Sequence, residues 1–378
     1  MRRGPRILVV SPVPSHPADQ GNAARILASA RALMARGATL EFLYYELEGL
    51  EPAQEAAMRG FWAALHVQPA VPPRRQSFAT HWGIDDWCPD ALCERVAALR
   101  QESGYDAVLV HYVWLSAALE GAGKAQRLLD THDLFGDRHL VARRDGLDPS
   151  WFFTSVPEES RGLDRADLVL AVQEEEAAEL RRRTARPVLT LGHPPTLDFL
   201  ADSLPARGRA PFGWLGSGNP WNLRAVTALD EALADAPDLP WLLAGRILRR
   251  PGLALHSAPL LLPDVPDPRD FYAAVDCVLN PMAGGTGLKI KTVEALGFGR
   301  PVIGTLDAFA GLAAEHPAHR AADVAEVVAH MREWQGNAAF RAELALASRL
   351  LALRYAAEVA RQYDTLAALL VAGPRPAG

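Results

Sequence analysis

Hydrophobic residues in this chain gather in short unbroken runs that alternate with segments in which apolar positions recur every three or four residues. The run from Arg6 to Val10 predicts a strand buried on both faces. From Asn22 to Gly37 the apolar spacing is helical, which predicts a helix with Asn22 as its N-cap. Thr39 to Tyr45 returns as a strand, and this alternation indicates an α/β protein with parallel sheets.

The alternation continues in two series of predicted strands, separated by His193-Pro194-Pro195. Because prolines stop a helix and favour an extended connection, we expect a domain boundary there. Beyond about Ala322 the pattern is helical only, and it ends in a long helix from Asn337 to Val371. The further strands expected are 106–111, 127–130, 168–172 and 187–191 in the first series, and 212–215, 241–244, 260–262, 274–279 and 301–304 in the second.

These boundaries predict two doubly wound, Rossmann-like domains of comparable size. The expected parts are an N-terminal domain over 1–192, a linker over 193–209, a C-terminal domain over 210–355, and a C-terminal helix with a frayed tail over 356–378 that can pack back on the N-terminal domain. Two such domains that face one another across a cleft place a ligand at the carboxyl ends of both sheets.

Composition narrows the function classes. The 378 residues include 39 Lys+Arg against 45 Asp+Glu, and the resulting net charge of -6 argues against a nucleic-acid binder with a broad basic surface. Residues 60–73, an uncharged run of a length that no other run in the chain exceeds, contain three prolines and are fewer than the ~20 apolar residues of a membrane span. Pro12 and Pro14 interrupt the first apolar run, so no signal peptide is expected, and the three cysteines, an odd number, fit a reducing compartment. We therefore expect a cytoplasmic protein.

The most informative stretch is NPMAGGTGLKIKTVEALGFGRPVIGT, residues 280–305. It predicts a strand end, a glycine-rich loop and a helix over about 288–298. Lys289 and Lys291 lie in the first turn, where the helix dipole favours acidic residues, so they imply an anionic partner such as phosphate. Glu294 follows on the same helix face as Lys291. An ordinary strand-to-helix turn with a surface Lys-Glu pair explains the same residues.

The segment GTGLKIKTVEALGFGRPVIGT resembles the donor-binding motif of retaining nucleotide-sugar glycosyltransferases of the GT-B fold, family 4-like, in which a glycine-rich turn and an EA-x-x-x-G-x-PV segment hold the nucleotide diphosphate and the sugar. The resemblance extends over most of the chain through four further segments, WLLAGR, LPDVPDPRDFYAAVDCVLNP, RILVVSP and QGNAAR. It implies that Glu294 accepts hydrogen bonds from ribose hydroxyls, and that backbone N–H groups of the turn contact phosphate and sugar. The residues of this turn are Gly285, Thr286, Gly287 and Leu288. The family often carries a second glutamate, which contacts hydroxyls of the donor sugar, at the position of Thr286. The resemblance therefore does not identify the donor sugar.

A second loop, with Gly216 and Gly218, lacks the third glycine of a dinucleotide fingerprint, which disfavours an NAD-dependent oxidoreductase. A phosphate-facing turn remains an interpretation. Members of the resembled family often have an arginine or lysine in this loop, whereas here none occurs before Arg224. The countercharge of a diphosphate is then expected from the two lysines and from Arg246, although a solvated arginine at a strand end fits Arg246 equally well.

In the N-terminal half, His132 and Asp133 follow a predicted strand, and His111 ends the preceding one. The resembled family has a histidine beside the donor sugar at the place of His132, and Asp133 then orients it or binds acceptor. A structural or solvated histidine is the common alternative. Gly21 and Asn22 occupy the first strand-to-helix loop, which in resembling enzymes approaches the sugar or the acceptor, although helix capping explains them equally well.

The expected function is therefore transfer of a sugar from a nucleotide diphosphate sugar to a hydroxyl of a glycan, a lipid-linked acceptor or a small molecule, with retention. His132, Asp133 and Lys289 are the expected catalytic residues, with no cofactor beyond the donor and no metal. An epimerase or hydrolase on the same fold, or a non-catalytic nucleotide-sugar-binding protein, stays open. Arginine clusters such as 181–183 allow a peripheral contact with the inner face of a membrane, but a solvated helix face also explains them.

Overall fold

The computed structural model describes residues 3–73, 75–149, 151–200, 209–285 and 287–373, and the chain divides into two compact units. Unit 1 contains Met1–Pro194 together with the end of the chain, Val359–Gly378. Unit 2 contains Pro195–Glu358. Each unit is built on its own parallel sheet, so the predicted α/β fold with two doubly wound sheets is confirmed.

The sheet of unit 1 has seven strands in the order β3-β2-β1-β4-β5-β6-β7, all parallel. Its strands are β1 (Arg6–Ser11), β2 (Thr39–Glu46), β3 (Leu65–Pro69), β4 (Ala107–His111), β5 (Gln126–Asp130), β6 (Leu168–Ala171) and β7 (Val188–Thr190). The sequence pattern missed β3, an edge strand with only its first residue fully buried, because a half-exposed strand followed by prolines gives little hydrophobic periodicity.

The helical segments of unit 1 are α1 (Gly21–Met34), α2 (Pro52–Phe61), α3 (Asp90–Ser103), the 3-10 helix η1 (Val113–Ala122), α4 (Arg138–Arg144), α5 (Val156–Leu163) and α6 (Glu174–Arg183). The prediction that Asn22 caps α1 is wrong, since Gln20 is the N-cap and Asn22 lies in the first turn. The Asn22 side chain instead accepts a hydrogen bond from the N–H of Ala23. A plain capping role therefore does not explain Asn22.

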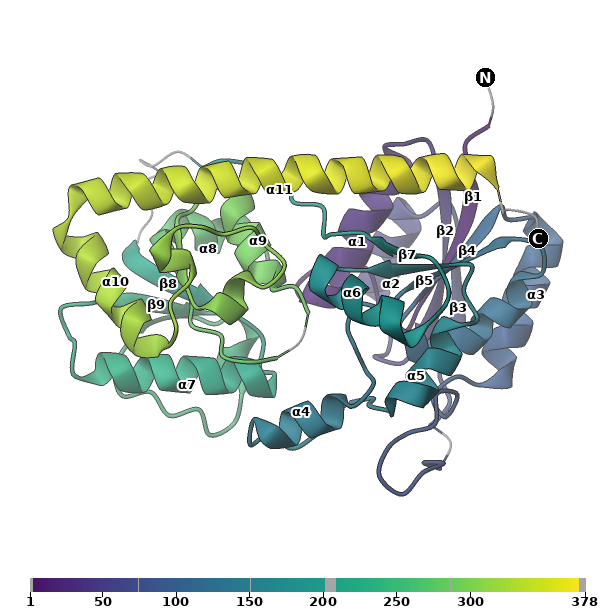
Figure 1. Ribbon diagram of the computed structural model, residues 1–378, viewed down its shortest axis with the longest axis horizontal. Coiled ribbons are helices and arrows are strands. Elements are labelled where there is room, and N and C mark those ends of the chain that lie inside the picture. The colour runs from purple at the N-terminus through teal and green to yellow at the C-terminus, as the bar shows by residue number, and fades with distance from the viewer. Residues whose placement is uncertain (1–2, 74, 150, 201–208, 286, 374–378) are drawn as a thin grey trace. The chain divides into compact units, whose positions relative to one another are not determined.

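The sheet of unit 2 has five strands in the order β10-β9-β8-β11-β12, again all parallel. Its strands are β8 (Ala210–Leu215), β9 (Trp241–Ala244), β10 (Leu260–Leu262), β11 (Val275–Asn280) and β12 (Val302–Gly304). Its helical segments are α7 (Pro220–Ala234), η2 (Arg246–Arg249), α8 (Pro268–Ala274), α9 (Ile290–Gly297), η3 (Leu306–Phe309), η4 (Pro317–His319) and α10 (Val324–Gly336). Figure 1 shows α7 on one side of this sheet and the pair α8 and α9 on the other.

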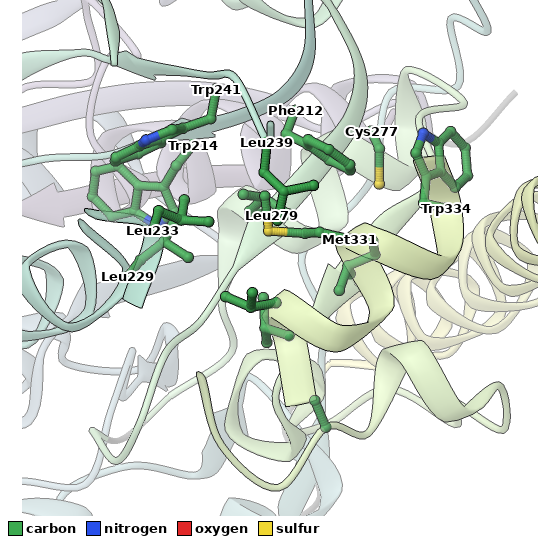
Figure 2. Close-up of a cluster of buried hydrophobic side chains, with 14 of the residues drawn as sticks. Phe212, Trp214, Leu229, Leu233, Leu239, Trp241, Cys277, Leu279, Met331 and Trp334 are labelled. Atoms are coloured by element: carbon green, nitrogen blue, oxygen red, sulfur yellow. The ribbon is translucent and has the colours of Figure 1, made fainter. Parts of the chain in front are cut away.

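Alternate residues of the unit 2 strands supply two separate cores, as a sheet buried on both faces requires. One core packs Trp214 and Trp241 against α7 and α10, with Met331 and Trp334 contributed by α10 (Figure 2). The other packs the opposite strand faces against α8 and α9. Helices therefore pack on both faces of the sheet, and this packing fixes the carboxyl ends of the strands, where the loops of interest begin.

One long helix, α11 (Ala338–Ala372), contributes to both units. In unit 2 its buried Ser348 contacts His319 and accepts a hydrogen bond from the N–H of Val302. In unit 1 the Tyr363 hydroxyl donates to Ser29 at 2.7 Å. The expected long C-terminal helix is confirmed, and no helix in the described ranges combines the length and the apolar character that a membrane crossing needs.

Candidate functional site

The strand order reverses at one place in each sheet, and the candidate residues gather there. In unit 1 the reversal lies between β1 and β4, and in unit 2 between β8 and β11. Ligands of doubly wound sheets bind beyond the carboxyl ends of the strands at such a switch point. His111 ends β4, while the loops with Gly216 and Gly285 follow β8 and β11. The topology therefore places the two glycine loops of unit 2 on neighbouring strands.

The loop after β8 approaches its own strand closely. A Cβ on Gly216 would lie 2.2 Å from Cη2 of Trp214, so only glycine leaves room for the indole beneath it. Gly218 has no such constraint, because its nearest side-chain atom would be 3.5 Å away on Arg250. Asn219 caps α7 by accepting the N–H of Asn222 at 2.8 Å. The loop is therefore held at both of its ends.

The loop after β11 packs across the start of α7. A Cβ on Gly285 would lie 3.4 Å from the ring of Trp221, and Gly285 has a φ of 80°, a left-handed conformation suited to glycine. Arg224 donates to the carbonyl of Ala283, and the N–H of Gly284 donates to Asp307 at 2.6 Å. Thr286, expected to contact the donor, lies outside the described residues.

Helix α9 begins at Ile290, two residues later than the pattern predicts, and Lys289 is its N-cap residue. Its side chain does not cap the N–H groups of the first turn, and that turn holds no acidic residue. The first N–H groups of a helix have no carbonyl partner within it, so they attract an anion. The Lys289 ammonium donates to the carbonyl of Gly287 at 2.8 Å, while Leu288 is buried and anchors the turn.

Lys291 connects the two loops. Its Nζ donates to Oδ1 of Asn222 at 2.6 Å and lies 4.4 Å from the centre of the Trp214 ring, a cation–π contact. Asn222, on α7, in turn donates through Nδ2 to the carbonyl of Ser217 at 3.0 Å. Burial, together with the charge of Lys289, lowers the pKa of Lys291 to about 7, although Glu294 acts in the opposite direction.

Glu294 lies one turn further along α9, and its carboxylate is 3.4 Å from the Tyr272 hydroxyl. Burial raises the pKa of Glu294 to about 7 against the opposing effects of Tyr272 and Lys291. Its proton is therefore gained or lost near neutral pH, as expected of a group in a functional site. Arg246 is exposed at the end of β9, where η2 begins, on the strand next to β8.

Unit 1 carries a different kind of cluster at its switch point. Arg25 of α1 forms a buried ion pair with Asp130, with Nη2 and Oδ1 2.9 Å apart and both side chains 2% exposed. Nδ1 of His111 lies 2.8 Å from Nε2 of His132 and 3.4 Å from the Asp130 carboxylate. Tyr112 stacks on His132 at 4.3 Å and is hydrogen-bonded to Asn22. The structure thus brings Asn22, His111 and His132 together.

The charges of this cluster are balanced internally. Burial alone would raise the pKa of Asp130, but the positive charge of Arg25 and the neighbouring histidines hold it far below its usual value. Burial also lowers the pKa of His132 well below its ordinary value, so its imidazole is neutral at pH 7. Asp133, predicted to orient His132 or to bind acceptor, forms an ion pair with Arg138 at 3.0 Å.

Sequence reasoning missed Arg25, Asp130, Asn222 and Trp214. An arginine directly before Ile26 on an otherwise apolar helix face was the available signal for Arg25. Asp130 ends the strand predicted over 127–130, and this position alone indicates no role for it. No sequence signal connects Asn222 to Lys291, since the contact spans 69 positions.

His111, Asp130 and His132 offer the ligand atoms of a metal site, with one atom from each within 4.8 Å of the others. Arg25, however, donates to both oxygens of the Asp130 carboxylate. A divalent cation would add two positive charges beside a buried guanidinium, which is costly in a low-dielectric interior. The set fits a buried Arg–Asp pair beside two histidines better than a metal centre.

Solved structures with the same fold cover nearly the whole chain. Sucrose-phosphate synthase from Thermosynechococcus elongatus aligns with a TM-score of 0.71 at 18% identity, over 97% of this chain and 99% of that one. HepE from Anabaena in complex with UDP-glucose aligns with a TM-score of 0.67 at 14% identity, over 97% of this chain and 100% of that one. A glycosyltransferase from Rickettsia africae aligns with a TM-score of 0.64 at 13% identity, over 98% of this chain and 99% of that one. No protein-family model matches the sequence, and no curated protein sequence matches it either. The chain has the GT-B-like fold of these glycosyltransferases.

Proposed function

We propose that this chain is a glycosyltransferase that takes a sugar from a nucleotide diphosphate donor. One observation carries the proposal: two lysines meet two glycine loops at the switch point of unit 2, and Lys291 is held there by a neutral amide and an indole. An ammonium fixed in place without being neutralised is suited to an anionic ligand. The fold of glycosyltransferases, one of them solved with UDP-glucose, supports the same ligand class.

In this proposal the diphosphate lies at the N-terminus of α9, where Lys289 and Lys291 stabilise the charge that develops as it departs. Arg246 adds a third cation, and backbone N–H groups of Gly218, Gly285, Gly287 and Leu288 contact the phosphates and the sugar. The N–H of Gly216 donates to the carbonyl of Ala244, so Gly216 serves the donor by keeping the loop free of a side chain. The Glu294 carboxylate accepts hydrogen bonds from the ribose hydroxyls. Fixed cations of this kind need no rearrangement when the bond breaks, which is the main source of rate in many active sites.

In this proposal unit 1 binds the acceptor and contacts the transferred sugar. We place His132 against the sugar, with its imidazole oriented by His111. Gly21 and Asn22, in the first turn of α1, meet the sugar or the acceptor. The acceptor is a hydroxyl of a glycan, a lipid-linked molecule or a small molecule. We further propose membership of the retaining, family 4-like group, with front-face attack, no protein nucleophile and no metal. The neutral His132 fits hydrogen bonding to a sugar better than binding of a charged group.

A panel of nucleotides and nucleotide sugars in thermal unfolding tests the donor assignment, because a ligand that binds only the folded chain raises its stability. We expect one nucleoside diphosphate and its sugar conjugate to raise the Tm, and Lys289→Ala to remove that shift. Lys124→Ala is the matched control, since Lys124 is an exposed lysine of unit 1. A panel without any stabilising nucleotide contradicts the proposal.

The reaction is tested by incubating the best donor with and without a mixture of glycan and lipid-linked acceptors. Transfer that depends on acceptor supports the proposal, and Lys289→Ala and Glu294→Ala should each lower its rate by about 10². Free sugar or an epimer formed rapidly from donor alone would instead indicate a hydrolase or an epimerase. The anomeric configuration of the product, measured by NMR, decides between retention and inversion.

A further inference from the structure

Two uncharged groups fix Lys291 in one position. Its ammonium donates to the Asn222 amide oxygen at 2.6 Å and lies over the Trp214 ring at 4.4 Å. Holding a long, flexible side chain in one conformation costs rotamer entropy. A carboxylate in place of Asn222 would fix the ammonium and cancel its charge, whereas an amide and an indole fix it and leave the charge available.

The groups that hold Lys291 are themselves rigid. Asn222 is 3% exposed and donates through Nδ2 to the carbonyl and the hydroxyl of Ser217, at 3.0 and 3.2 Å. Trp214 is fully buried, with its ring packed beneath Gly216. Both belong to the segment around the loop between β8 and α7. A lysine from α9 is thus attached to a loop that it does not belong to.

That loop has no cation of its own. Residues 216–223, GSGNPWNL, contain neither arginine nor lysine. Asn222 and Trp214 bring the ammonium of Lys291 to its base from the neighbouring strand-to-helix connection. The arrangement has a clear physical benefit, since a cation that is already ordered loses little further entropy when an anion binds.

We propose that Asn222 and Trp214 are positioning residues that hold Lys291 against the loop between β8 and α7, so that one lysine serves the donor diphosphate from both glycine loops. This inference rests on the proposed function, since it assumes that the diphosphate lies beside α9. It goes further in assigning a role to two residues that do not themselves need to touch the donor. A contact that only ties α7 to α9 is the competing explanation.

A double-mutant cycle on UDP affinity separates the two explanations, because residues that act through one another give non-additive effects. The probes are UDP and uridine, measured by calorimetry, with ADP and GDP in the same series so that the best nucleoside diphosphate and its nucleoside are carried forward. We expect Lys291→Met to weaken the diphosphate about 100-fold. Asn222→Ala should weaken it about tenfold, as the cost of ordering one lysine predicts, and should leave the nucleoside within twofold.

In the Lys291→Met background, Asn222→Ala should weaken diphosphate binding by less than a further twofold. An equal loss in both backgrounds, or an equal loss for nucleoside and diphosphate, would overturn the positioning role and favour a structural tie. Lys124→Met, at an exposed site in unit 1, makes the same charge change and should leave both affinities unchanged. If Asn222→Ala does not fold, Asn222→Ser retains a small hydrogen-bonding acceptor and takes its place in the cycle.

The chain offers a second readout because it contains only three lysines, Lys124, Lys289 and Lys291. Lysine-selective NMR therefore gives three side-chain signals, which the Met variants assign. We expect the Lys291 signal to titrate near pH 7, and UDP to move its midpoint upward by more than one unit. Trp214→Leu should shift the Lys291 signal because the ring current is lost. An unchanged Lys291 signal in a folded Trp214→Leu variant would refute the indole contact.

Different outcomes would refute the donor site and the positioning role. If no nucleoside diphosphate binds, or if Lys291→Met binds it as tightly as the unmodified chain does, the donor site itself is wrong, and the inference with it. If Lys291→Met weakens binding but the Asn222 effect is additive with it, the donor site stands and only the positioning role is lost.

Discussion

The two units place charged side chains at the same topological position but treat the charge in opposite ways. In unit 1 the guanidinium of Arg25 meets the carboxylate of Asp130, and both are almost fully buried. In unit 2 the ammonium of Lys291 meets an amide oxygen and an aromatic face. A buried charge that is cancelled depends on its partner, because removal of the partner leaves it unpaired, whereas one that is held by uncharged groups is suited to a ligand of opposite sign.

Backbone conformation separates the units as well. Tyr112 and His132, which follow β4 and β5, both have φ values in the left-handed region, 73° and 60°. Non-glycine residues adopt this region at a cost of about 1–3 kcal/mol, and such residues cluster at functional sites. In the loop after β11 the left-handed positions are instead taken by glycines, among them Gly284, Gly285 and Gly287. In these loops unit 1 thus orients side chains, whereas unit 2 has glycines, which allow close approach to the backbone.

The largest expected effect comes from breaking the internal pair of unit 1. Asp130→Asn leaves the Arg25 charge buried without a counterion, and we expect the free energy of unfolding to fall by about 3–5 kcal/mol in urea titrations. Asp364→Asn is the control, because Asp364 is 67% exposed in its pair with Arg36 and should cost less than about 0.5 kcal/mol. Equal losses in the two variants would show that the buried pair has no special role.

The next effect concerns the close approach in unit 2. Gly216→Ala places a Cβ 2.2 Å from the buried Trp214 ring, and we expect a loss of about 2–3 kcal/mol in the free energy of unfolding. Gly218→Ala, two residues along the same loop, meets nothing closer than 3.5 Å and should change stability by less than about 0.5 kcal/mol. Similar unfolding curves for the two alanine variants would contradict the packing described for this loop.

A pH effect of intermediate size is expected at His193 in unit 1. Burial and the charge of Arg25 lower the pKa of His193 to about 3, so the folded chain holds it neutral while the unfolded chain protonates it below about 6.5. The free energy of unfolding therefore falls progressively as the pH drops from about 6.5 to about 3. The loss caused by His193 amounts to about 2 kcal/mol at pH 5.

Comparison of His193→Gln with the unmodified chain isolates this contribution. Urea unfolding at pH 7 and pH 5 should show a loss on acidification that is about 2 kcal/mol smaller in His193→Gln. The comparison is needed because the raised pKa of Glu294 acts with the opposite sign, adding stability as the pH falls below about 7. His256→Gln, at an exposed position, is the control and should leave the pH dependence as it is. Parallel curves for His193→Gln and the unmodified chain would refute the prediction.

The smallest expected effect sharpens the assignment of Glu294. Ionised, its carboxylate accepts with both oxygens and binds ribose hydroxyls more strongly than the protonated acid does, so UDP affinity should fall as the pH drops below about 7. Protonated Lys291 favours the diphosphate, so affinity should also fall as the pH rises above about 7. Glu294→Gln should remove the acidic limb only and reduce the preference of UDP over 2'-deoxy-UDP about tenfold. Glu343→Gln, exposed on α11, should leave both features intact, and an unaltered acidic limb in Glu294→Gln would refute the assignment.

Much of the fold follows from local pattern. Strands buried on both faces, such as β1 and β4, appear as unbroken apolar runs, and Asp267 before Pro268 marks the start of α8 where the structure has it. The candidate site was predicted less completely. Lys289, Lys291 and Glu294 were found because a glycine loop and a helix start are local features. Asn222 and Trp214 were not, because each is explained locally by a helix turn or a hydrophobic core.

The amino-acid order alone determined the alternation of strands and helices and the glycine-rich turns, since both depend on residues only a few positions apart. The tertiary structure decided which charges meet. Arg25 and Asp130 are 105 positions apart, and Lys291 and Asn222 are 69 apart. Such pairs form only when the strand order brings particular loops to one edge of a sheet, and local periodicity carries no information about that order.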